Sequence, residues 1–386
     1  MHQNAARQDI SALHYGRGIA ALLVCLFHSH GLIEKYFGGL AWGNIFQAGH
    51  SGVEFFFILS GFIILFAHRQ DIGRPEKVRP FLAKRAIRIL PLFWLIAAPL
   101  GAVFLLAPML GADRQLTDAK LLTDLLLIPR EGVLTLPPAW TLQHEAVFYL
   151  LFTLALVHRM AGIVAIGLWQ GICVVVMVFS LADPNYLLPI NKLIGFHNLG
   201  FGVGLVIALF FASHLFASAK PALLMCGAGA VITLTAMFAG EWIIGPKLFG
   251  GGAALSLSYI AIYALIILAM LSIAQRRHAV LEATLGVLGS ASFALYLLHE
   301  PVASLVNQLL ILPAMQPAIG PVTAYFILVI ACVATAIVVH LAVERPVIAS
   351  LKRGLVAKGI GLSRRSPSNM RVQAAKLSIV AKGTAS

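Results

Sequence analysis

Two side chains that could do chemistry lie eleven positions apart in one apolar stretch near the N-terminus. The stretch YGRGIAALLVCLFHSHG, residues 15–31, carries Arg17 near its start and His28 near its end. On an α-helix both would point to the same side, about 16 Å apart along the axis. Ionisable residues inside a membrane span are costly and mark functional sites. We therefore predict that a cation and a general base line one face; the alternative is an arginine that snorkels to the membrane surface with an interfacial histidine.

A second apolar stretch, GVEFFFILSGFII, begins with a carboxylate and contains a small polar pair. We expect Glu54 to lie at a depth similar to that of His28, where a carboxylate could orient the imidazole. Ser60 and Gly61 interrupt the apolar run, which indicates either a polar contact at the site or close packing of small residues.

Basic residues gather in FLAKRAIRILPLFW, at the start of a third stretch. Arg85 and Arg88 are three positions apart and share a helical face, with Lys84 beside them. Two guanidinium groups on one face can bind phosphate groups in a bidentate manner. The alternative is that these residues only anchor the helix at the membrane surface.

Two further stretches carry polar groups at helical spacing. In AWTLQHEAVFYLLF, Glu145 and Tyr149 are four positions apart and face the same way. In SASFALYLLHEP, a serine, Tyr296 and His299 form one stripe, and Pro301 is expected to bend or break the helix after it. We predict that Ser60, Tyr149, Tyr296 and His299 line the site.

The motifs of several other site classes are absent. His144 and Glu145 are not followed by a second histidine, because position 148 is a phenylalanine, so the zinc-peptidase motif H-E-x-x-H is excluded. No P-loop and no G-x-S-x-G nucleophile elbow occurs. The four cysteines lie in apolar stretches without a C-x-x-C pair. We predict no metal.

The elements that must position these residues are membrane helices. The chain has 386 residues, 60% hydrophobic and 11% charged, with a mean hydropathy of +0.90. A span needs about 20 apolar residues. The sequence predicts an all-α, polytopic membrane protein of about ten transmembrane helices, at 13–30, 51–68, 89–110, 138–157, 161–181, 194–217, 222–244, 250–274, 286–312 and 321–343.

The distribution of positive charge predicts the orientation. With both termini cytoplasmic, most loop Lys and Arg residues fall on the inside. The net charge of +13 therefore favours anionic membrane lipid as a partner, not nucleic acid. The loop 69–88 is also well placed to meet an anionic cytosolic cofactor. Residues 1–348 form the integral-membrane domain, and residues 349–386 form a basic cytoplasmic tail that we expect to be poorly ordered.

Together these stretches resemble the acyltransferase 3 family, the membrane O-acyltransferases of bacterial surface polysaccharides. The resemblance runs from residue 13 to about residue 346. It rests on six motifs in order: RGIAALLVCLFH, GVEFFFILSGF, KRAIRILP, WTLQHEAVFY, SFALYLLHEP and ERP. In two places the chain departs from the usual family pattern, with Glu54 where many relatives have Asp and Phe293 where Tyr is frequent.

The resemblance implies an activity and roles for individual residues. It implies that Arg17 and His28 are essential, that Arg85 and Arg88 serve acyl-CoA binding, and that Glu145 is the acid of the fourth span. The expected reaction moves an acyl group, acetyl above all, from cytosolic acyl-CoA to a hydroxyl of a saccharide or lipid-linked sugar at the outer face of the cell inner membrane.

The mechanistic expectation makes His28 the base that deprotonates the hydroxyl. It would be oriented by Glu54 or Glu145, while Arg17 would hold the cofactor or stabilise negative charge near the thioester oxygen. Direct transfer and an acyl-enzyme on His28 or Ser60 both remain open at this stage. So do two other functions: a transporter or flippase, and acylation of a small molecule such as a macrolide.

Overall fold

The computed structural model describes residues 11–111, 115–130, 132–180, 191–244, 252–273, 280, 282–312, 315 and 318–357, and these contain no strand. The helices are α2 (Ser11–Phe37), α3 (Gly52–His68), α4 (Val78–Leu106), α5 (Asp118–Leu125), α6 (Trp140–Val157), α7 (Arg159–Ser180), α8 (Asn191–Ile194), α9 (Leu199–Phe211), α10 (Leu215–Ile244), α11 (Gly252–Ser272), α13 (Val287–Leu310), α14 (Pro321–Val339) and α15 (Arg345–Ala357). Short helical turns precede several of them, including η1 (Gln47–Ser51) before α3 and η5 (Pro137–Ala139) before α6.

The prediction of an all-α membrane protein is confirmed. Ten helices of the described part are long and apolar enough to cross a membrane, and each overlaps a predicted span. The third begins earlier than expected, at Val78, because its basic first turns are also helical. The ninth helix was expected to bend or break at Pro301; α13 does not break there and continues to Leu310.

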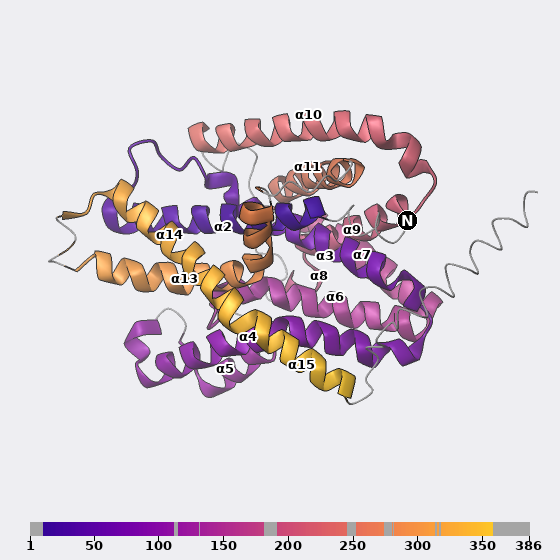
Figure 1. Ribbon diagram of the computed structural model, residues 1–386, viewed down its shortest axis with the longest axis horizontal. Helices are drawn as coiled ribbons and strands as arrows, with labels where there is room; N and C mark the ends of the chain where they lie inside the picture. The colour runs from indigo at the N-terminus through magenta and orange to yellow at the C-terminus, as the bar shows by residue number, and fades with distance from the viewer. Residues whose placement is uncertain are drawn as a thin grey trace, which may run out of the picture.

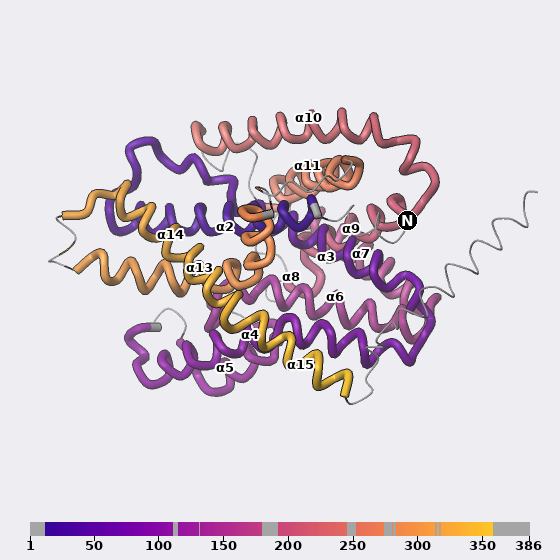
Figure 2. Tube along the Cα trace, viewed as in Figure 1, coloured from indigo at the N-terminus to yellow at the C-terminus, as the bar shows by residue number. Residues whose placement is uncertain are grey.

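Helices from distant parts of the sequence form the centre of the bundle. α2 packs against α13, α13 packs against α14, and α3 packs against α9. The tube trace shows the first of these pairings, with the indigo α2 running beside the orange α13 (Figure 2). In the membrane-span windows, 67% of α3 is buried but only 22% of α10, which lies along one outer edge (Figure 1). The most buried helices are therefore those that carry His28, Glu54 and His299.

Small residues bring α3 and α9 into close contact. A Cβ atom on Gly61 would lie 2.2 Å from the carbonyl oxygen of Phe201, and one on Gly204 would lie 2.0 Å from that of Ile58. Backbones approach this closely in membrane bundles only where side chains are small. Gly61 therefore serves close packing, as the sequence allowed, while its neighbour Ser60 makes a polar contact described below.

We expect Gly61→Ala to destabilise the protein by about 1–3 kcal/mol, because the added methyl group meets backbone that cannot move without separating α3 from α9. Thermal unfolding in detergent measures the effect. The matched control is Gly229→Ala on α10, where a Cβ atom would have nothing within 4 Å. Equal melting temperatures for the two variants would contradict the packing argument.

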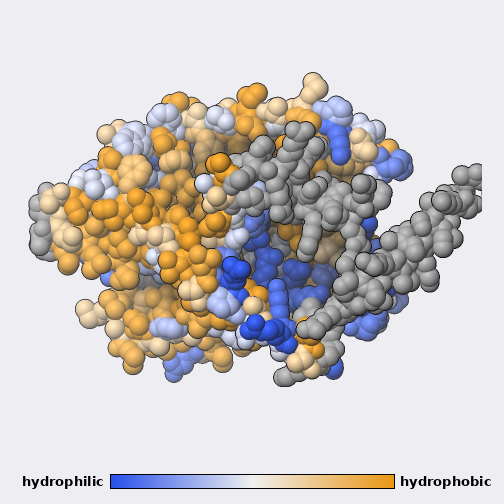
Figure 3. All heavy atoms as spheres, in the orientation of Figure 1, coloured by the Kyte–Doolittle hydropathy of each residue, from blue (hydrophilic) through white to orange (hydrophobic). Residues whose placement is uncertain are grey.

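The surface agrees with a membrane location. Most of the face seen in Figure 3 is apolar, and a hydrophilic area gathers around α4 and α15. A π-helical turn at His340–Glu344 joins α14 to α15, which carries the first residues of the basic tail to Ala357. The remainder of the predicted tail, 358–386, lies outside the described residues.

Candidate active site

Two cavities lie in the centre of the bundle, and α2 contributes one predicted site residue to each. The first, the His28 cavity, has a volume of about 310 Å³. It is lined by Val24, His28, His50, Val53, Glu54, Pro137, Pro138, Trp140, His197, Tyr296, His299 and Glu300. Helix α2 places His28 there, α3 places Glu54, and α13 places Tyr296 and His299, so four residues predicted from sequence meet in one space.

A carboxylate on α13 pairs with His28. Nδ1 of His28 lies 3.3 Å from Oε1 of Glu300, and the imidazole is 40% exposed while the carboxylate side chain is 24% exposed. The ring of His299 lies beside that of His28, with 5.0 Å between centroids. If Nδ1–H faces Glu300, the lone pair of Nε2 is left for an incoming proton. This arrangement suits a general base that is held in one tautomer.

The expectation that Glu54 or Glu145 orients His28 is corrected by this pairing. Glu54 shares the cavity, but its Oε1 accepts a hydrogen bond of 2.6 Å from Ser256 and lies 3.8 Å from Nδ1 of His197. The sequence criterion that selected Glu54, an ionisable group inside a span, applies equally to Glu300 in LLHEP. The spacing along the chain gave no way to rank them.

His50, which also lines the His28 cavity, belongs to a second histidine–carboxylate pair that sequence reasoning did not single out. Nε2 of His50, on η1, lies 3.5 Å from Oε2 of Glu241 on α10. Glu241 is buried and accepts a 2.5 Å hydrogen bond from Tyr259. His50 lies before the apolar run of its span, which is why the composition of that run did not reveal it.

The second cavity, the Arg17 cavity, gathers the predicted cationic groups. Arg17 from α2 lines it together with Arg85 and Arg88 from α4. Its other lining residues are Val53, Phe56, Phe57, Leu59, Ser60, Ile63, Ile64, Thr141, Leu142, Glu145, Phe201, Ser292, Phe293 and Tyr296. Lys84 is not among them. Three guanidinium groups around one cavity have the chemistry to bind an anion with several phosphate groups.

Glu145 organises the wall of the Arg17 cavity. It accepts a 2.8 Å hydrogen bond from Oγ of Ser60 and another from the hydroxyl of Tyr149. The guanidinium of Arg85 lies over the ring of Tyr149, with 5.7 Å to the centroid, and its Nη2 lies 3.3 Å from Nε2 of His68. Glu145 thus belongs with the arginines and not with His28.

The two cavities are neighbours. Val53 and Tyr296 line both of them, so Arg17 and His28 line adjacent cavities of the bundle. A ligand whose phosphate groups contacted the arginines could extend toward His28 past these two shared residues. The prediction placed Arg17 and His28 on one face of α2; the structure places them in two adjacent cavities.

A groove lies next to the His28 cavity. We call it the Tyr36 groove; it has a volume of about 310 Å³ and shares Pro137 and Glu300 with the His28 cavity. Its walls come from the ends of α2, α4 and α13, and include Tyr36, Ser304, Asn307 and Gln308.

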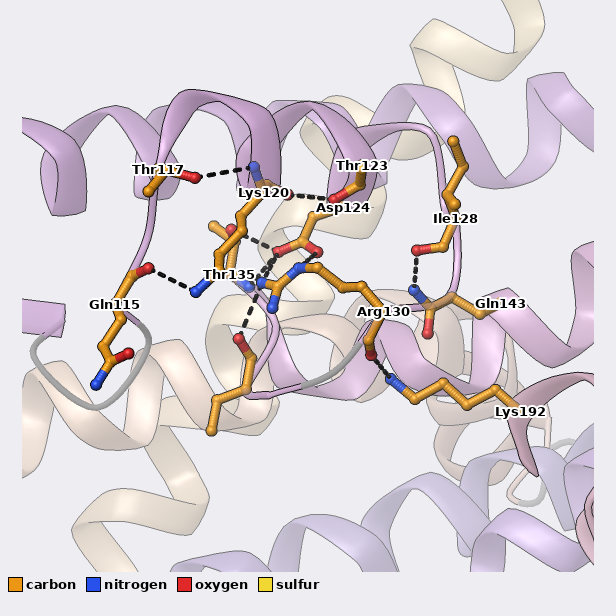
Figure 4. A network of polar contacts seen from close by, with 11 residues as sticks. Gln115, Thr117, Lys120, Thr123, Asp124, Ile128, Arg130, Thr135, Gln143 and Lys192 are labelled. Atoms are coloured by element: carbon orange, nitrogen blue, oxygen red, sulfur yellow. Dashed lines mark hydrogen bonds and ion pairs between the residues drawn. The ribbon is translucent and has the colours of Figure 1, made fainter. Parts of the chain in front are cut away.

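A buried ion pair fixes the loop that leads to Pro137 (Figure 4). Asp124 accepts hydrogen bonds of 2.6 and 2.8 Å from Arg130 and of 2.7 and 2.8 Å from the backbone and hydroxyl of Thr135. Lys192 donates to the carbonyl of Arg130 at 3.0 Å. Both oxygens of this buried carboxylate accept hydrogen bonds, so Arg130 and Thr135 are held beside the end of α5.

Comparison with known proteins settles the family. A family model described as an acyltransferase domain, Acyl_transf_3, matches residues 10–341. The chain belongs to the acyltransferase 3 family. This acyltransferase is 26% identical over 327 residues to the exopolysaccharide production protein ExoZ of Rhizobium meliloti (strain 1021), covering 81% of this chain and 92% of that protein. It is 30% identical over 151 residues to protein 2 in the picA locus of Rhizobium radiobacter, covering 34% and 74%.

No solved structure gave a significant match. The family and the ten apolar helices make the chain a multi-pass membrane acyltransferase related to polysaccharide production.

We expect Glu300→Gln in this acyltransferase to lower kcat about 100-fold with little change in the KM for the acyl donor, because the neutral amide no longer fixes and stabilises the imidazole. Steady-state kinetics of the purified protein measure both constants. Glu54→Gln is the matched comparison, since it removes another buried carboxylate from the same cavity. A larger loss of kcat in Glu54→Gln than in Glu300→Gln would return the orienting role to Glu54.

Proposed function

We propose that the protein is an O-acetyltransferase that moves an acetyl group from cytosolic acetyl-CoA to a hydroxyl of a cell-surface or lipid-linked saccharide, with His28 as the general base. The observation that carries the proposal is the pair of adjacent cavities, in which three arginines line one cavity and a histidine–carboxylate pair lines the next. Family membership and the similarity to ExoZ support the acyl transfer and the saccharide class.

The donor would bind from the side of the Arg17 cavity. Arg85 and Arg88 would hold phosphate groups of coenzyme A, as charge-assisted hydrogen bonds to phosphate favour guanidinium groups. The thioester would then extend past Tyr296 and Val53 toward His28. Arg17, the third guanidinium of the cavity, would hold the cofactor or stabilise the negative charge that develops on the thioester oxygen.

The acceptor would reach His28 from the Tyr36 groove. In the direct route, Nε2 of His28 takes the proton of the acceptor hydroxyl as its oxygen attacks the thioester carbonyl carbon. The carbon–sulfur bond then breaks, the ester remains on the saccharide, and the thiolate leaves and takes up a proton as coenzyme A. Glu300 stabilises the imidazolium that forms in between.

The proposed orientation follows from charge. The loop between α3 and α4, which is rich in Lys and Arg, faces the cytosol in a protein that has both termini inside the cell. We place the protein in the cell inner membrane, with the Arg17 cavity toward the cytosol and the Tyr36 groove toward the outer face. Anionic lipid would surround its basic loops.

The test is acetyl transfer by the purified protein in lipid nanodiscs. Labelled acetyl-CoA is supplied with lipid-linked oligosaccharides extracted from a host strain that lacks the gene. We expect label to enter the oligosaccharide and free coenzyme A to appear in equal amounts, only when both substrates are present. Two outcomes would overturn the proposal. The first is that label enters a macrolide offered as acceptor and does not enter the oligosaccharide. The second is that the protein moves the lipid-linked oligosaccharide across the membrane of proteoliposomes without releasing coenzyme A.

A further inference from the structure

The proposed base and two side chains beside it could together hold a metal ion. His28, His299 and Glu300 each offer one ligand atom, and these atoms lie within 4.8 Å of one another. Nδ1 of His28 and Oε1 of Glu300 are 3.3 Å apart. Around tetrahedral Zn²⁺, with bonds of about 2.0–2.2 Å, two ligand atoms are separated by roughly 3.3 Å. Two of the three atoms therefore already have the spacing that zinc requires.

His299 supplies an independent reason to expect a ligand. Its Nδ1 lies 2.7 Å from the carbonyl oxygen of Tyr296, so Nδ1 carries the hydrogen and Nε2 presents a lone pair. Among the described residues this Nε2 finds no hydrogen-bond partner, and the side chain is only 2% exposed. A buried lone pair without a donor is costly. Metal-binding histidines typically donate their other ring N–H to a carbonyl in this way.

The surroundings favour a cation. The lining of the His28 cavity includes two carboxylates, Glu54 and Glu300, and no Lys or Arg. The three arginines line the other cavity. The Tyr36 groove, which shares Glu300 with this cavity, offers an approach for a small ion. Two imidazoles and one carboxylate form a donor set that zinc takes in proteins, with a fourth position left open.

We propose that His28, His299 and Glu300 bind one Zn²⁺ ion and that this ion inhibits the enzyme. The binding stands on the geometry alone, whereas the inhibition rests on the proposed function of His28 as base. When Nδ1 of His28 coordinates the ion it gives up its hydrogen, and the neutral ring then carries hydrogen on Nε2. No lone pair is left to accept the proton of an acceptor hydroxyl. His28 therefore cannot bind zinc through Nδ1 and act as the base through Nε2 at the same time.

The binding arm uses protein stripped with EDTA and titrated with Zn²⁺ by calorimetry, with Co²⁺ absorption to report tetrahedral coordination. We expect one ion per chain and a Kd raised at least about 10-fold in His299→Gln and in Glu300→Gln. The matched control is His50→Gln, an imidazole of the same cavity outside the trio, for which we expect the wild-type Kd. Absence of binding, or equal weakening by all three substitutions, would overturn the site.

The activity arm separates the two proposals. We expect added Zn²⁺ to abolish acetyl transfer by the wild-type enzyme and EDTA to restore it. Stripped enzyme that is inactive until zinc is added would overturn the inhibitory role, because the ion would then be required. If no variant and no condition transfers acetyl while Zn²⁺ binding still depends on His299 and Glu300, the metal site stands and the proposed function fails.

Discussion

Replacing His28 with alanine is expected to lower the rate of acetyl transfer about 10²–10⁴-fold, because the acceptor hydroxyl loses the group that removes its proton. The KM for acetyl-CoA should change little, since the arginines that would hold the donor line the neighbouring cavity. Initial rates with labelled acetyl-CoA and the lipid-linked oligosaccharide measure both effects.

The control for this prediction separates chemistry from folding. His214→Ala removes an exposed histidine outside both cavities and should retain wild-type rates. Thermal unfolding of His28→Ala should match that of the wild type, as the imidazole is only partly enclosed. Turnover within threefold of the wild type in a well-folded His28→Ala protein would remove His28 from its role as base.

The second large effect concerns the donor. We expect Arg85→Ala combined with Arg88→Ala to raise the KM for acetyl-CoA at least about 100-fold, because each guanidinium–phosphate hydrogen bond contributes about 1.5–3 kcal/mol. The rate at saturating acetyl-CoA should fall far less than it does in His28→Ala. Direct binding of labelled coenzyme A to the purified protein gives the same comparison without turnover.

Arg79→Ala is the matched control for the donor prediction. It removes an exposed guanidinium from the same helix, outside the Arg17 cavity, and tests whether net charge alone attracts the cofactor. Lys84→Ala gives an intermediate comparison, since Lys84 is adjacent in sequence but does not line the cavity. Equal weakening of binding by Arg79→Ala and by the double variant would show that the arginines act only through the general field of the surface.

The spans could be predicted from sequence because bilayer thickness fixes how many apolar residues a crossing helix needs. The ends of the spans could not be predicted in this way. Apolar content placed the start of the third span at residue 89, yet the hydrogen-bonded helix begins at Val78 and includes Arg85 and Arg88. A helix continues wherever its backbone is satisfied, and long basic side chains at a membrane surface are compatible with that.

The site, too, could be predicted from the sequence only in part. Helical periodicity placed Arg17 and His28 on one face of the first span, and Glu145 and Tyr149 on one face of the fourth. In the structure Tyr149 donates a hydrogen bond to Glu145, while Arg17 and His28 line two adjacent cavities. Which carboxylate meets His28 depends on how α2 packs against α13, far away in sequence. No spacing along the chain encodes that choice, which is why Glu300 emerged only from the fold.

The hydrogen bonds that the Asp124 carboxylate accepts have a consequence for the selectivity of the proposed enzyme toward its acceptor. Thr135, which donates two hydrogen bonds to it, comes two residues before Pro137, and Pro137 lines both the His28 cavity and the groove beyond it. If the acceptor enters between the groove and the His28 cavity, as proposed, the Pro137 side of that entrance is held by hydrogen bonds before it binds. Under the proposed function, a bulkier sugar would then be accommodated by movement of the side where α2 and α13 end, and not of the Pro137 side.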